Sequence, residues 1–182
     1  MEKKIIFIHI PKTGGTSIYR SLKDKVDIGY HYHEPLHRIY SKEQLNDSFV
    51  FTVVRNPWDK LVSTFFYCCQ TQKHQWFFKK YDSEFDMFMK DFKRGKVPYL
   101  VLFKAQYKFL MHKPDMILKF ECLQQDFNKL CDKIGIEKYE LPHNKKSKHK
   151  HFTEYYNDET KKIVSDIYQK DVELLNYKFK EK

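Results

Sequence analysis

The sequence is poor in glycine and proline, with 5 Gly and 6 Pro among 182 residues. This scarcity excludes collagen-like and low-complexity proteins, and an aromatic content of 17% argues against a largely disordered chain. A hydrophobic fraction of 41% is sufficient for one core, and no linker or internal repeat divides the chain. We therefore expect a single domain over residues 1–182.

Cysteine and long apolar segments are also scarce. The chain has four cysteines and neither a CxxC motif nor a Cys/His zinc pattern, so we expect no metal site and buried, reduced thiols. The apolar run Ile5–Ile8 is too short for a signal peptide or a membrane span. These features predict a cytoplasmic protein without a transmembrane segment.

Negative charge is in deficit: 34 Lys and Arg stand against 24 Asp and Glu, a net charge of +10. An excess of this size favours an anionic partner, which nucleic acid, acidic lipid, a phosphorylated cofactor or an acidic glycan would each satisfy. No RNA-binding strand motif or helix-turn-helix is evident, so we do not expect nucleic acid. The sequence carries no signal of oligomeric state.

Two segments have the order strand, turn, helix. The apolar run Ile5–Ile10 predicts a buried strand, and the turn after it leads into a helix capped by Thr16 or Ser17. Phe49–Val54 predicts a second strand, followed by a helix that Asn56 caps. This repetition indicates an α/β fold with a central, mainly parallel sheet flanked by helices.

The remaining segments predict further elements of the same kinds. We expect irregular structure over residues 27–46, helices over 84–92 and 99–111, a strand over 115–120 and a helix ending near Gly135. A last helix should begin after Asn157 and place Ile163, Val164, Ile167, Tyr168 and Leu175 on its buried face.

The turn after the first strand has the composition of an anion-binding loop. It reads Pro11-Lys12-Thr13-Gly14-Gly15-Thr16-Ser17 and joins a strand to a helix N-terminus, where backbone N–H groups and the helix dipole favour an anion. The loop is not a Walker A motif, because its lysine precedes the glycines.

A second anion site is expected after the second strand. Arg55 follows the carboxyl end of that strand, and its planar guanidinium suits a phosphate. Ser63 lies two turns into the next helix and can donate a hydroxyl hydrogen bond. Two anion sites on neighbouring strands match a ligand with phosphate at both ends.

These motifs resemble those of the sulfotransferases that use 3′-phosphoadenosine 5′-phosphosulfate (PAPS). The similarity is to the branch with heparan sulfate 2-O-sulfotransferases and bacterial carbohydrate sulfotransferases. It covers nearly the whole chain through Phe7–Ser17, Phe51–Ser63, Leu118–Glu121, Asp126–Phe127, Pro142–His151 and Tyr155–Tyr156.

The resemblance implies a P-loop-like sulfotransferase fold and a set of roles. The loop from Pro11 to Ser17 would bind the 5′-phosphosulfate, and Arg55 and Ser63 would bind the 3′-phosphate. Lys146 and Lys148 would contact the nucleotide. The product would be adenosine 3′,5′-bisphosphate (PAP), and the acceptor a hydroxyl group of a carbohydrate, with a lipid-linked sugar or another small molecule as alternatives.

The expected chemistry needs a base and a positive charge, but no metal. His33, in the sequence His33-Glu34-Pro35-Leu36, matches the catalytic histidine of the family, and His31 stays an alternative. The ammonium group of Lys12 can stabilise the negative charge that develops on the oxygen of the departing phosphate. His9 is expected to be a structural residue at the end of the strand.

Two other functions fit the sequence less well. A P-loop kinase or nucleotidase would need a lysine after the glycines and a carboxylate for magnesium at a strand end, where this chain has Arg55. A basic module that binds nucleic acid without catalysis would need a recognisable motif, which the sequence lacks. Sulfuryl transfer is therefore the predicted function.

Overall fold

The computed structural model describes residues 4–33, 39–142 and 149–179. The chain divides into two compact units, residues 1–55 with 106–144 and residues 56–105 with 145–182. The expectation of a single domain over residues 1–182 stays a prediction.

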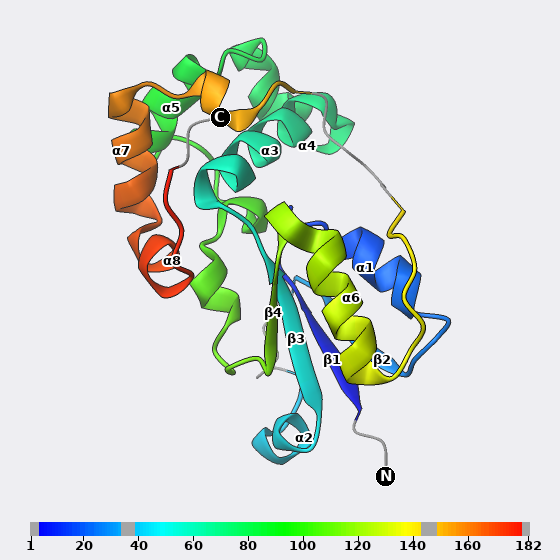
Figure 1. Cartoon of the computed structure of the whole chain (residues 1–182). Coiled ribbons are helices and arrows are strands. Elements are labelled where there is room, and N and C mark those ends of the chain that lie inside the picture. Colours follow the sequence, from blue (N-terminus) through cyan, green and yellow to red (C-terminus); the bar gives the residue numbers. More distant parts are fainter. Residues whose placement is uncertain (1–3, 34–38, 143–148, 180–182) are drawn as a thin grey trace. The chain divides into compact units, whose positions relative to one another are not determined.

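The first unit contains a parallel sheet, as the sequence predicts. Its strands are β1 (Ile5–His9), β2 (Ile28–Tyr32), β3 (Phe49–Val54) and β4 (Met116–Lys119), in the order β2-β1-β3-β4 (Figure 1). All three pairs of neighbours are parallel. The two central strands are buried almost throughout, because both consist of continuous apolar runs that suit a sheet covered on both faces.

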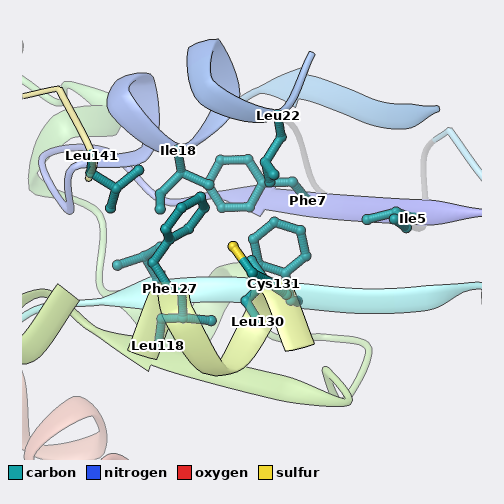
Figure 2. Packing of buried hydrophobic residues seen from close by; sticks show 11 residues of the cluster. Ile5, Phe7, Ile18, Leu22, Leu118, Phe127, Leu130, Cys131 and Leu141 are labelled. Atoms are coloured by element: carbon teal, nitrogen blue, oxygen red, sulfur yellow. The ribbon is translucent and has the colours of Figure 1, made fainter. Parts of the chain in front are cut away.

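Two helices, α1 (Gly15–Leu22) and α6 (Leu123–Ile134), pack on one face of this sheet. Helical spacing of four residues places Ile18 and Leu22 of α1 on the same buried stripe. Gly135 ends α6 as predicted, with a left-handed φ of 73°. Figure 2 shows the resulting core, whose labelled side chains come from both helices, from the strands and from the segment after α6: Ile5, Phe7, Ile18, Leu22, Leu118, Phe127, Leu130, Cys131 and Leu141.

The expectation of irregular structure over residues 27–46 was wrong, because this segment contains β2 and the short helix α2 (Lys42–Asn46). The sequence of β2, Ile-Gly-Tyr-His-Tyr, lacks a continuous apolar run, as fits an edge strand whose partner is β1. A capping box starts α2: Ser41 Oγ accepts a hydrogen bond from the backbone N–H of Gln44 at 3.2 Å.

Predictions at two other places also failed. The helix expected over residues 99–111 is replaced by two short 3₁₀ helices, η3 (Val101–Phe103) and η4 (Gln106–Phe109). The N-cap of α1 is Gly14, which has a left-handed backbone, rather than Thr16 or Ser17, so the helix begins less than one turn earlier than expected. A third 3₁₀ helix, η5 (Phe120–Cys122), follows β4.

The second unit is helical and has an aromatic core. Its longest helix is α3 (Pro57–Gln70), in which Phe65 is fully buried and lies 4.7 Å from Phe88 between ring centroids. The other elements of this unit are α4 (Gln72–Phe78), η2 (Lys79–Tyr81), α5 (Phe85–Lys93), η3, η6 (Phe152–Tyr155), α7 (Asp158–Ile167) and α8 (Gln169–Leu174).

The predicted cap of α3 is confirmed. The side-chain oxygen of Asn56 accepts hydrogen bonds from the N–H groups of Trp58 at 3.0 Å and Asp59 at 3.4 Å. One turn further, the buried ammonium group of Lys60 donates to the carbonyl oxygens of Leu102 at 2.9 Å and Lys104 at 3.2 Å. These bonds satisfy the charge of Lys60 inside the unit, so it has a structural role.

The last predicted helix is shorter than expected. Asn157 caps α7 as predicted, in a capping box with Thr160. The helix ends at Ile167, whose side chain is 45% exposed, and α8 begins at Gln169. The expectation that Ile167 lies on the buried face was therefore wrong, since the continuous helix on which it rested is broken at Tyr168.

The thiols agree in part with the sequence prediction. Cys68 and Cys131 are buried, whereas Cys69 and Cys122 are partly exposed, and all four are free. Burial raises the pKa of the Cys69 thiol to about 11, so this group is protonated near neutral pH.

The core of the first unit predicts the cost of one substitution. Phe127→Ala should lower the free energy of unfolding by about 3–5 kcal/mol, because it removes a fully buried ring and leaves a cavity between α6 and the sheet. Urea unfolding measures the change. The control Leu174→Ala alters a side chain that is 69% exposed and should cost under about 1 kcal/mol. Equal effects would contradict the packing.

Candidate functional site

The loop after β1 contains two residues in the left-handed region of backbone conformation, Lys12 with φ 65° and Gly14 with φ 85°. Between them, Thr13 is buried, and its hydroxyl donates to the carbonyl of Ile10 at 2.8 Å. This bond holds the tight turn together. Helix α1 then starts at Gly15. The N–H of Ser17 donates to the carbonyl of Gly14 at 3.0 Å, whereas the first N–H groups of a helix have no preceding turn to supply an acceptor. The loop therefore directs polar hydrogens and the positive end of the helix dipole outward from the carboxyl edge of the sheet.

Gly14 and Gly15 are needed for different reasons. The left-handed φ of Gly14 is a conformation that L side chains rarely adopt. At Gly15 the constraint is space: a Cβ atom would lie 2.2 Å from Cδ2 and 2.5 Å from Nε2 of His9. The imidazole of His9 thus packs directly against the start of α1.

Arg55 follows β3 and is tied to the loop. Its Nη1 donates to the carbonyl oxygen of Lys12 at 3.0 Å, and its guanidinium carbon lies 3.9 Å from the ring centroid of Phe120. The stacked ring supports one face of the guanidinium by a cation–π contact. The side chain is only 8% exposed, so its orientation is fixed by its surroundings.

The backbone of Arg55 is held by a residue that sequence reasoning missed. Gln106 accepts the N–H of Arg55 at 2.9 Å through Oε1 and donates to the Arg55 carbonyl at 2.7 Å through Nε2. Both groups are buried, and this pair of bonds satisfies them at the point where β3 ends. Nothing in the sequence marks Gln106 for this role, because it comes 51 residues after Arg55.

A second missed residue lies beside the histidines. The hydroxyl of Tyr30, on β2, is 2.7 Å from Nδ1 of His9. The ring of His33 also contacts that of His9, with 4.8 Å between centroids. Burial, and after it the neighbouring His33, lowers the pKa of His9 to about 3, so His9 is neutral near pH 7.

The predicted site residues thus fall into three groups. One group lies at the carboxyl edge of the sheet in the first unit, where His33 contacts His9, His9 packs on Gly15, and the loop Pro11–Ser17 bonds to Arg55. Ser63 is buried on α3 in the second unit. The third group, Lys146 and Lys148, lies outside the described residues, as does the side chain of His31.

Metal-binding clusters and membrane-spanning helices are absent from the residues that the structure describes. Within the described residues, no three His, Cys, Asp or Glu side chains gather in a way that could hold a metal ion. No helix in the same part of the chain is both long enough and apolar enough to cross a bilayer.

The fold and the site define a parallel α/β protein with a glycine loop, an arginine and a histidine cluster at one edge of its sheet. Among protein-family models, residues 1–178 match the sulfotransferase family, which includes carbohydrate sulfotransferases. The chain belongs to the sulfotransferase family and is a transferase of that type. Searches of curated proteins and of solved structures returned no match.

The depressed pKa of His9 predicts a pH dependence of stability. In the unfolded chain His9 takes up a proton below about pH 6.5, whereas in the folded chain it does so only near pH 3. Between these values the unfolded state binds more protons, so acid destabilises the fold. The loss from this group approaches about 1.4 kcal/mol per pH unit.

Denaturant unfolding of the wild type and of His9→Gln from about pH 7 to about pH 5 tests this, because glutamine does not titrate. The stability of the wild type should fall more steeply than that of the variant. Parallel curves would show that His9 is not buried in its neutral form.

Proposed function

We propose that this chain transfers a sulfuryl group from PAPS to a hydroxyl group of a carbohydrate. The observation that carries the proposal is the loop Pro11–Ser17 at the carboxyl edge of the sheet, with Arg55 bonded to the carbonyl of Lys12 beside it. Membership of the sulfotransferase family supports sulfuryl transfer as the reaction. The donor, the acceptor and the residue roles are our inference.

The residues present suit a donor with anionic groups at two ends. The N–H groups at the start of α1 and the side chain of Lys12 would bind the 5′-phosphosulfate. The planar guanidinium of Arg55 matches the geometry of a phosphate, and we assign it, with the hydroxyl of Ser63, to the 3′-phosphate. Lys146 and Lys148 are the proposed contacts from the C-terminal loop.

The reaction follows from these positions. The acceptor oxygen attacks sulfur while the bond from sulfur to the 5′-phosphate oxygen breaks, so PAP carries away the electron pair. His33 takes the proton of the acceptor hydroxyl. Lys12 and the N-terminus of α1 stabilise the negative charge that develops on the departing oxygen, the task that a metal ion has in kinases.

Arg55 supplies the first test. If it reads the 3′-phosphate, the protein should bind PAP more tightly than AMP or ATP, which lack that group. Arg55→Ala should weaken PAP binding by about 1.5–3 kcal/mol, the scale of a charge-assisted hydrogen bond, and AMP binding by less, because AMP loses only the support that Arg55 gives to the Lys12 carbonyl. Titration calorimetry measures all three ligands.

The control is Arg20→Ala, which removes the same charge from an exposed position in the last turn of α1. It should change PAP affinity by under about 0.5 kcal/mol, the usual effect of an exposed charge. Equal affinity of the wild type for PAP and AMP would rule out the proposed role of Arg55.

The base is tested by kinetics with PAPS and a panel of glycan, lipid-linked sugar and small-molecule acceptors. His33→Ala should lower kcat by about 10²–10⁴-fold, the usual value of general-base catalysis, with PAP affinity little changed.

Lys12→Ala should lower kcat by about 10²-fold or more. Activity should survive EDTA.

His112→Ala, a histidine outside the proposed site, is the control and should keep the activity of the wild type. A larger loss in His31→Ala than in His33→Ala would move the base by two residues. Inactivation by EDTA with rescue by magnesium would favour the kinase alternative.

A further inference from the structure

His9 is a buried polar residue to which the proposed reaction assigns no role. It ends β1, is 4% exposed, and lies in a stack with Phe7 at 5.7 Å and Tyr30 at 5.3 Å between ring centroids. Burying an imidazole costs free energy unless its nitrogens are satisfied. A purely structural strand end would be served as well by an apolar side chain, so the polar ring calls for an explanation.

Three neighbours fix the position of the His9 ring. The Tyr30 hydroxyl engages Nδ1 at 2.7 Å, which prevents free rotation about the bond to the ring. Phe7 stacks with the ring at 5.7 Å between centroids. Gly15 closes the edge that carries Cδ2 and Nε2, since even a methyl group there would overlap the ring. The imidazole ring of His9 is therefore held in one orientation.

The side chain of His33 contacts the ring of His9. Its backbone has a φ of 62°, a left-handed conformation that is uncommon for a side chain of this size and persists where the surroundings enforce it. Its ring meets that of His9 at 4.8 Å between centroids, with 51° between the planes. The imidazole of His9 is therefore in a position to orient the ring of His33.

The neutral state of His9 is compatible with the proposed protonation of its neighbour His33. A cationic group so close to His33 would oppose its protonation, whereas the depressed pKa of His9 keeps that ring neutral over the range in which histidines usually titrate. A neutral, polarisable ring supports the orientation of His33 without adding repulsion.

We propose that His9 is a positioning residue for His33, which it orients by ring contact, and that Tyr30 and Gly15 hold His9 in place for this purpose. The inference rests on the proposed function of His33 as the base. It adds a chain of contacts from the start of α1 through His9 to the base.

The mildest test is Tyr30→Phe, which keeps the aromatic stack and removes only the hydroxyl bound to His9. A small displacement of a base is costly, so we expect kcat to fall by about tenfold while the KM for PAPS and the Kd for PAP stay within about twofold. The matched control is Tyr19→Phe, which removes a hydroxyl from the ring stacked on Tyr30 at 3.8 Å. It should keep the kcat of the wild type. Equal kcat in both variants and the wild type would overturn the proposal.

A double-mutant cycle separates positioning from a general structural role. His9→Gln should lower kcat in the wild-type background, yet in the His33→Ala background it should change kcat by less than about twofold, because there is no base left to orient. Additive losses, or a large rise in the Kd for PAP in His9→Gln, would assign His9 a structural or binding role instead.

The same cycle distinguishes the two hypotheses. If His33→Ala alone keeps the kcat of the wild type, the assignment of the base fails, and the positioning role fails with it. If His33→Ala loses activity while the effect of His9→Gln is additive, the base assignment stands and only the positioning role is overturned.

Discussion

The parallel pairing of β1 with β3 is the constraint from which the site follows. Ile8 lies opposite Thr52 in this register, and the buried Thr52 hydroxyl donates to the Ile8 carbonyl at 2.9 Å. Because parallel strands end at the same edge, the chain leaves β1 into the glycine loop and leaves β3 into Arg55 at one place. In open α/β sheets this edge is where ligands bind. Residues more than forty positions apart are thereby brought into hydrogen-bond contact.

The polar groups at this edge are ordered before any ligand arrives. Arg55 is bonded at its backbone by Gln106, at its guanidinium by the Lys12 carbonyl, and lies on the ring of Phe120. Each bond satisfies a group whose burial would otherwise be costly. A site arranged in this way loses little conformational entropy on binding, so more of the interaction free energy is available for affinity. The same bonds make the arginine a poor candidate for a mobile surface charge.

The sequence predicts those parts of the fold and site that are determined by neighbouring residues, and it misses those that depend on residues distant in the chain. Strands β1 and β3 are continuous apolar runs, and the caps at Asn56, Gly135 and Asn157 are set by neighbouring residues, so all were predicted. Gln106 was missed because its partner is distant in sequence, and its apolar neighbours suggested a helix. The roles of Ser63, Lys146 and Lys148 stay predictions.

The most informative failure is β2. An edge strand is covered less than a central one, so its sequence can include Gly29, Tyr30 and a histidine without an apolar run, and periodicity alone does not identify it. Sequences tend to depart from local rules where function imposes other demands. Here the departure coincides with the strand that supplies Tyr30 and leads directly into His33 with its left-handed backbone. The weak strand signal of β2 therefore follows from its place at the edge of the sheet, where Ile28 and Tyr30 pack against the core and where the histidines that we propose take part in the reaction follow.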